Sequence, residues 1–139
     1  ETEHGPRGGD ELNILSSGKN YGWPEITYGK NYSGTTITKY THKEGMEQPV
    51  IHWTPSIAVC GIDFYDGELF NNWKNNLLVS SLKFERLYRL EIDDDKVIDQ
   101  EIIYEAGSRI RDVQTGPEGF IYIALEDPGR IVRFIPIKN

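Results

Sequence analysis

Apolar residues recur along this chain in short runs that are separated by turn residues. No segment long enough for an amphipathic helix carries apolar positions at the i, i+3, i+4 and i+7 spacing. The runs are instead rich in β-branched and aromatic residues, and Gly, Asp and Asn lie between them, which is typical of strands. The pattern therefore predicts an all-β chain.

The clearest stretch predicts four strands in meander order, which we place at residues 60–65, 76–82, 86–92 and 96–104. The pattern then restarts, with strands predicted at residues 110–114, 120–125 and 130–137. Two copies at a period of about 45 to 50 residues are typical of the antiparallel blades of a β-propeller. A β-sandwich, which also uses short strands, is the weaker alternative.

The repeat divides the chain into three parts. Residues 1–54 are interpreted as an incomplete blade with a long loop, containing strands at 11–15 and 49–53. Residues 55–105 are predicted to form a complete blade, and residues 106–139 a last blade that lacks its fourth strand. This is about two and a half blades, fewer than the four to eight of a closed ring. We therefore expect missing N-terminal blades, or self-association across the open sheet edges.

The amino-acid composition argues against several classes of function. Lys and Arg number 15 against 22 Asp and Glu, giving a net charge of -7, which argues against nucleic-acid or anionic-membrane binding as the main role. No apolar stretch approaches the roughly 20 residues that span a bilayer. The first residues hold no signal segment, and we expect that a preceding segment was removed by processing, was removed by cloning or lies outside this sequence. The single cysteine, Cys60, excludes an internal disulfide and is interpreted as a small buried thiol.

Three basic residues are candidates for binding an anion. Arg109 and Arg111 are one residue apart on a predicted strand, so both should project from one face, with Ile110 and Asp112 on the other. Arginine is well suited to bidentate carboxylate or phosphate contacts, although a solvated pair on a sheet surface is the alternative. Lys83 follows another predicted strand, in a polar loop.

A glycine-rich segment at residues 4–11 is a candidate cation site, because such backbone can turn carbonyl oxygens toward a hard cation. A plain loop is the alternative. His4, His42 and His52 show no metal-ligand spacing, and His52 is interpreted as structural. No nucleophile elbow, phosphate loop or dinucleotide fingerprint occurs, so nicotinamide chemistry is not indicated.

Five motifs, in order along the chain, resemble the soluble glucose/sorbosone dehydrogenase family, especially its aldose sugar dehydrogenase branch. They are Glu3-His4-Gly5-Pro6-Arg7-Gly8-Gly9-Asp10-Glu11-Leu12-Asn13, Gly18-Lys19-Asn20-Tyr21-Gly22-Trp23-Pro24, Ser81-Leu82-Lys83, Arg109-Ile110-Arg111-Asp112-Val113 and Pro117-Glu118-Gly119. The resemblance implies a six-bladed propeller, of which this chain is the C-terminal part, and a periplasmic or secreted location.

The resemblance also implies pyrroloquinoline quinone (PQQ) and calcium (Ca2+) as cofactors. Lys83, Arg109 and Arg111 match the family's basic contacts to the PQQ carboxylates. Ser56 matches a hydroxyl contact to PQQ, and Trp53 a wall of the sugar site. The backbone carbonyls of Gly5-Pro6 match the calcium ligands.

The function implied is oxidation of aldose sugars to lactones, with electrons passed from PQQ to an external acceptor. The family's general base is a histidine of an earlier blade, and no histidine here lies in that motif. The isolated chain is therefore expected to be inactive. Two alternatives remain, a non-catalytic propeller binding module and a calcium-dependent lactone hydrolase. The hydrolase would need carboxylate ligands such as Asp10, Glu11 and Asp112.

Overall fold

The computed structural model describes residues 1–137, which fold as ten strands and one short 3-10 helix, η1 (Asn71–Trp73). The strands are β1 (Thr2–Glu3), β2 (Asp10–Leu12), β3 (Ile51–Trp53), β4 (Val59–Phe64), β5 (Leu77–Ser81), β6 (Arg86–Asp93), β7 (Lys96–Glu105), β8 (Ile110–Thr115), β9 (Ile121–Leu125) and β10 (Arg130–Arg133). This part of the chain contains no helix with the length and hydrophobicity that a bilayer crossing requires. The prediction of an all-β chain is confirmed.

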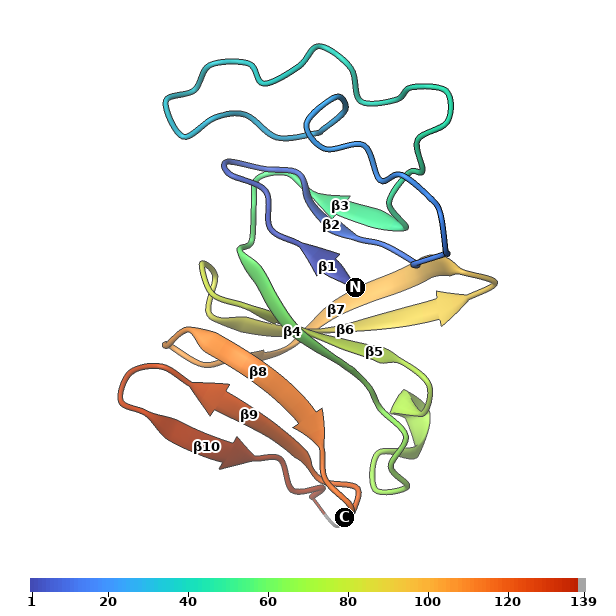
Figure 1. Ribbon diagram of the computed structural model, residues 1–139. Coiled ribbons are helices and arrows are strands. Elements are labelled where there is room, and N and C mark those ends of the chain that lie inside the picture. The colour runs from blue at the N-terminus through green and yellow to red at the C-terminus, as the bar shows by residue number, and fades with distance from the viewer. Residues whose placement is uncertain (138–139) are drawn as a thin grey trace. The chain divides into compact units, whose positions relative to one another are not determined.

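The strands form three sheets, in the orders β1-β2-β3, β4-β5-β6-β7 and β10-β9-β8 (Figure 1). The pairs β1-β2, β2-β3, β5-β6, β6-β7, β8-β9 and β9-β10 are antiparallel, as expected for meanders joined by short turns. The chain divides into two compact units, an N-terminal unit of residues 1–59 and a C-terminal unit that begins at Cys60.

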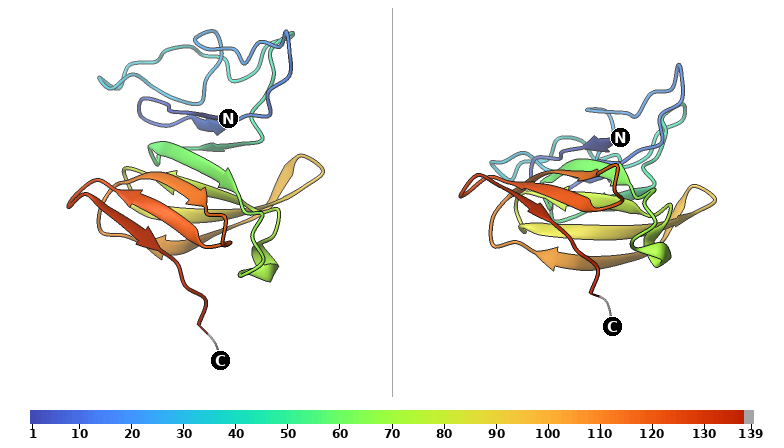
Figure 2. Two further views of the ribbon diagram at one scale, coloured as in Figure 1. Left: turned by 60° about the horizontal axis from the view of Figure 1, so that its bottom comes forward. Right: turned by 90° about the horizontal axis from the view of Figure 1, so that it is seen from below.

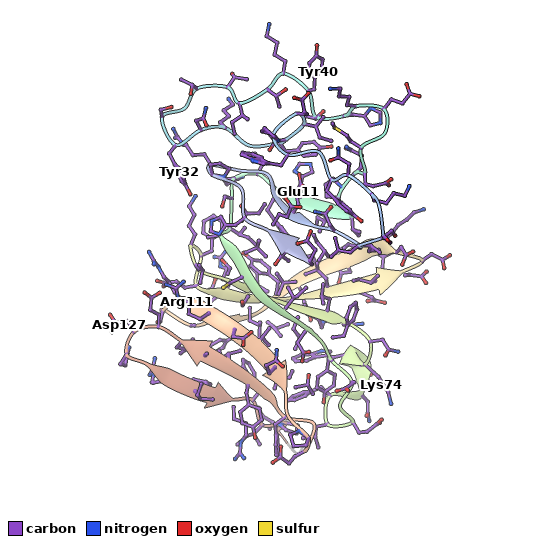
Figure 3. The ribbon with its side chains drawn as sticks, in the orientation of Figure 1. Glu11, Tyr32, Tyr40, Lys74, Arg111 and Asp127 are labelled. Carbon is purple, nitrogen blue, oxygen red and sulfur yellow. The ribbon has the colours of Figure 1, made fainter. Side chains whose placement is uncertain are left out.

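The N-terminal unit contains a small sheet and a long irregular segment between β2 and β3. Within the sheet, Glu3 pairs with Glu11, and Asp10 pairs with Trp53. The irregular segment contains one isolated bridge, between Lys30 and Thr36. Figure 3 labels Tyr32 and Tyr40 on this segment, where both side chains are exposed.

The C-terminal unit contains the four-stranded meander and the three-stranded sheet, which Figure 2 shows from two further directions. Alternate residues of β9 point into its core, as the period-2 pattern predicts, whereas in β8 two exposed residues separate the buried Ile110 and Val113. The buried core cluster consists of Tyr65, Leu78, Leu87, Ile110, Val113, Ile121, Ile123 and Leu125.

Two predicted strands continue three or four residues past the end of the observed ones. The strand predicted at residues 11–15 ends at Leu12, and the exposed Ile14 and Leu15 do not enter the core. The strand predicted at residues 130–137 ends at Arg133. Pro136 has no N–H to donate to a ladder, and Ile137 is 90 % exposed. A prediction based only on apolar residues therefore overestimated the length of both strands.

Tyr65 organises the turns at one end of the C-terminal unit. Its side chain is 0 % exposed, and its hydroxyl donates to the Gly119 carbonyl at 2.8 Å. The same oxygen accepts the backbone N–H groups of Leu69 and Phe70, each at 3.1 Å. One buried phenol thus connects the turn that precedes η1 with the turn between β8 and β9.

Replacing Tyr65 with phenylalanine should lower the free energy of unfolding by about 1–3 kcal/mol, because it leaves buried backbone groups without their partner. Urea denaturation measures the change. Tyr122→Phe is the matched control, since the Tyr122 hydroxyl makes no hydrogen bond within residues 1–137. Equal stability of the two variants would contradict the role given to the Tyr65 hydroxyl.

Candidate functional sites

Arg109 and Arg111 converge on one carboxylate oxygen. Arg111 Nη2 lies 2.8 Å from Oε2 of Glu126, and Arg109 Nη1 lies 3.6 Å from the same oxygen. Glu126 directly follows β9, beside the start of β8, and Figure 3 labels Arg111 and Asp127 at this edge of the sheet. The structure therefore brings the two arginines together, and sequence reasoning missed Glu126 because its partners belong to another strand.

A register shift between β8 and β9 changes the geometry of the sheet edge at Arg111. Ile110 pairs with Leu125 and Asp112 pairs with Ala124, so Arg111 is the extra residue of a β-bulge. Ile110 is buried, whereas Asp112 is exposed on the opposite face of the sheet. The prediction that Ile110 and Asp112 share a face is therefore wrong, because the bulge interrupts the alternation on which it was based.

Backbone hydrogen bonds hold the arginine pair in place. The Glu126 N–H donates to the Arg109 carbonyl at 3.0 Å, and the Asp127 N–H donates to Oγ of the buried Ser108 at 3.1 Å. The Cys60 thiol donates to the Arg111 carbonyl at 3.0 Å. Cys60 is half-buried rather than buried as predicted, and its thiol lies against the backbone of β8 instead of within the core cluster.

A cavity of about 240 Å³ adjoins the pair. Its lining residues are Glu85, Gly107, Ser108, Arg109, Glu126 and Asp127.

Lys83 lies in the turn between β5 and β6, where its side chain is exposed. The Phe84 N–H donates to Oγ of the buried Ser81 at 3.2 Å, which closes this turn. Lys83 Nζ lies 5.4 Å from the centroid of the Phe84 ring, within the range of a cation–π contact. The ammonium group is therefore at the surface of the turn, and three rotatable N–H donors are available to an anion.

Gly5 and Pro6 belong to the loop between β1 and β2 and line a cavity of about 340 Å³. Gly5 is buried, and a Cβ atom on it would lie 2.1 Å from the Gly8 carbonyl oxygen. Only glycine fits this position, so the loop folds closely on its own backbone. Such a loop has little freedom to redirect its carbonyl groups.

The cavity beside this loop is acidic. Glu3 and Glu11, which pair across β1 and β2, both line it. Burial raises the pKa of the Glu11 carboxyl, a hydrogen bond from Asn13 lowers it, and the charges of Glu3 and Glu1 raise it further. Burial also raises the pKa of Glu3, with a second contribution from the charge of Glu1.

The oxygen atoms of this cavity suit a hard cation, since uncompensated carboxylates repel one another there. Oδ1 of Asn13, a residue that is 2 % exposed, has no hydrogen-bond partner in residues 1–137. No group of three or more His, Cys, Asp or Glu residues within that range is arranged to hold a metal by itself. Backbone carbonyls would therefore have to supply part of any cation's coordination.

Trp53 and Ser56 lie in and just after β3. Trp53 is 7 % exposed, and Ser56 is also buried. Oγ of Ser56 accepts the Ala58 N–H at 3.1 Å, and Ala58 has a φ of 54°, in the left-handed region. The hydroxyl hydrogen of Ser56 is not used by this bond and can be donated to another acceptor.

The three histidines lie in different settings. His52 is in β3, as predicted, and its ring stacks on Tyr28 with 3.7 Å between ring centroids. Burial lowers the pKa of His52. His4 lines the acidic cavity, whereas His42 is exposed in the irregular segment.

Residues 1–133 match the glucose/sorbosone dehydrogenase family. The chain is 44 % identical over 138 residues to aldose sugar dehydrogenase YliI of Escherichia coli (strain K12), a match that covers 96 % of this chain and 37 % of that protein. A crystal structure of a glucose dehydrogenase has a TM-score of 0.93 at 42 % identity, covering 98 % of this chain and 40 % of the other.

The PQQ-bound form of the aldose sugar dehydrogenase of Streptomyces coelicolor has a TM-score of 0.67 at 24 % identity, covering 95 % of this chain and 38 % of the other. A likeness at that identity shows the fold. The prediction of a propeller segment built from antiparallel sheets is confirmed. The chain spans about two fifths of the length of the proteins it matches. By its sequence and its fold, this chain belongs to the glucose/sorbosone dehydrogenase family.

Proposed function

We propose that this chain is the cofactor-binding C-terminal portion of a PQQ- and calcium-dependent dehydrogenase that oxidises aldose sugars to lactones. The observation that carries the proposal is the convergence of Arg109 and Arg111 on a carboxylate oxygen. PQQ carries three carboxylates, which are ligands of the kind that this pair already binds in Glu126. The family membership of the chain supports the same function.

The arginine pair has donors to spare for a cofactor. Each guanidinium group carries five N–H donors, and the contacts to Glu126 occupy one nitrogen of each. Both side chains are about half exposed, so their remaining donors can be reached from solvent. With Lys83, the C-terminal unit would offset the negative charge of PQQ. The residues present therefore fit this cofactor.

The loop between β1 and β2 fits calcium on separate grounds. Calcium binds backbone carbonyl and carboxylate oxygens, and Gly5 and Pro6 line this cavity together with Glu3 and Glu11. Burial raises the pKa values of Glu3 and Glu11, and neighbouring carboxylates raise them further. A divalent cation would offset the repulsion between these carboxylates. The carbonyls of Gly5 and Pro6 are our proposed ligands.

Bound PQQ would supply a quinone that accepts hydride from the sugar, and calcium would polarise a quinone oxygen. The residues of this chain would bind and orient the cofactor and the sugar. Ser56 would donate its hydroxyl hydrogen to PQQ, and Trp53 would form part of the sugar-site wall. A histidine outside this chain removes the proton of the sugar hydroxyl, so the isolated chain is proposed to be inactive.

The proposed partners are an aldose sugar and an external electron acceptor, and the proposed location is the periplasm or the cell exterior. Further partners are the family's N-terminal blades, or a second copy of the chain. β10 is an edge strand, and its Ile131 is 70 % exposed, which supports such a partner at this edge.

Replacing both Arg109 and Arg111 with alanine should weaken PQQ binding by roughly 100-fold. Each charged hydrogen bond contributes about 1.5–3 kcal/mol, and each 1.4 kcal/mol is a tenfold change in affinity. A fluorescence titration with PQQ, in calcium, on the full-length protein that contains this chain measures the affinity. Arg133→Ala, which removes a cation–π contact to Phe120, is the matched control. Unchanged affinity in the double variant would contradict the proposed cofactor contacts.

Replacing Glu11 with glutamine should raise the free energy of unfolding at about pH 7 without calcium, and leave it unchanged at about pH 4. The pKa of Glu11 is raised in the folded state, so its stabilising contribution is complete below the ordinary value of 4.5. That contribution is lost as the pH rises through the raised pKa, and glutamine cannot ionise. Urea denaturation at the two pH values measures the difference.

Calcium at about pH 7 should stabilise the wild-type chain more than the Glu11→Gln variant, because the variant has less repulsion for the cation to relieve. Glu44→Gln, at an exposed position in the same unit, is the control. A Glu11→Gln variant less stable than wild type at pH 7 without calcium would show that this carboxylate does not destabilise the fold.

A further inference from the structure

Asp10 is a fully buried carboxylate whose two oxygens accept hydrogen bonds from backbone groups. Its side chain is 0 % exposed at the start of β2. Oδ1 accepts the Gly5 N–H at 2.8 Å, and Oδ2 accepts the Val59 N–H at 3.0 Å. No salt bridge to Asp10 is found among residues 1–137. These two short bonds therefore hold a charge that is otherwise costly to bury.

The first bond fixes the loop that presents the Gly5 and Pro6 carbonyls. The Gly5 N–H belongs to the peptide directly before the Gly5 carbonyl, so this bond restricts how that carbonyl can turn. The other end of the loop is held by Gly9, whose N–H donates to the Trp53 carbonyl at 2.9 Å and to Oγ1 of Thr54 at 3.0 Å. The loop is thus anchored at both ends, and Asp10 supplies the side-chain anchor at Gly5.

The second bond fixes the turn that follows β3. Val59 ends a segment in which Oγ of Ser56 accepts the Ala58 N–H and Ala58 has a positive φ. A non-glycine residue holds that conformation only where its surroundings impose it. The bond from the Val59 N–H to Asp10 is one such restraint, applied at the residue after Ala58.

We propose that Asp10 is a positioning residue, whose buried carboxylate sets the Gly5-Pro6 carbonyls for calcium and the Ser56 turn for PQQ by binding both segments at once. This inference rests on the proposed function. Both bonds lie within the N-terminal unit, so the carboxylate acts inside one compact body. Asp10 itself touches neither cofactor in this account.

Asp10→Asn is the sharpest test, because asparagine keeps the shape but replaces one acceptor oxygen with an N–H₂ donor. That donor would face the N–H of Gly5 or of Val59, so one segment loses its anchor. The calcium affinity, measured by isothermal titration calorimetry on the full-length protein that contains this chain, should fall on the order of tenfold. This is the lower end of the effect of removing groups that orient metal ligands.

Tyr65→Phe is the control for stability, since it weakens buried hydrogen bonds in the C-terminal unit and leaves the Gly5 loop intact. Titrations are made well below the melting temperature of each variant, so that every protein is folded. Calcium affinity should be unchanged in Tyr65→Phe.

The possible outcomes distinguish the positioning role of Asp10 from the proposed function of the chain. If the wild-type protein binds calcium and Asp10→Asn binds it equally well, the positioning role is wrong and the proposed function stands. If Asp10→Asn and Tyr65→Phe lose calcium affinity alike, the effect is a general loss of stability and the positioning role is again wrong. If the wild-type protein binds no calcium, the proposed function fails and this inference fails with it.

Discussion

The arrangement of the arginine pair, Arg109 and Arg111, depends on one carboxylate oxygen, Oε2 of Glu126. Arg109 and Arg111 are close together on one sheet edge, where two positive charges repel each other. Glu126 contacts both, and its own N–H binds the Arg109 carbonyl, so side-chain and backbone contacts act on the same edge. The β-bulge at Arg111 supplies the geometry, because it places an extra residue where the two strands would otherwise stay in register.

The N-terminal unit carries a cluster of negatively charged side chains. Glu3 and Glu11 share a cavity with Gly5 and Pro6, and burial together with like charge raises the pKa values of both carboxyl groups. Such a cavity favours a cation for the same reason that the arginine edge favours an anion. The chain thus carries two sites of opposite preference, which correspond to the metal and the organic anion that we propose it binds.

The strand order of the C-terminal unit could be predicted because alternation depends only on which residues are apolar. The bulge at Arg111 could not, since it depends on how β9 pairs with β8. The Glu126 contact was missed for the same reason, as it joins residues of different strands. The roles of Gly5 and Pro6 came from a family motif. Backbone carbonyl ligands cannot be recognised from the residue types of a sequence. In the structure, the close approach of Gly5 to the Gly8 carbonyl shows that this loop is tightly folded.

The most direct measurement of the central claim is a crystal structure of the full-length protein that contains this chain, with PQQ and calcium. The account predicts PQQ carboxylates within hydrogen-bonding distance of Lys83, Arg109 and Arg111, and an anomalous calcium signal at the carbonyls of Gly5 and Pro6. PQQ bound away from these basic residues, or calcium away from that loop, would contradict it.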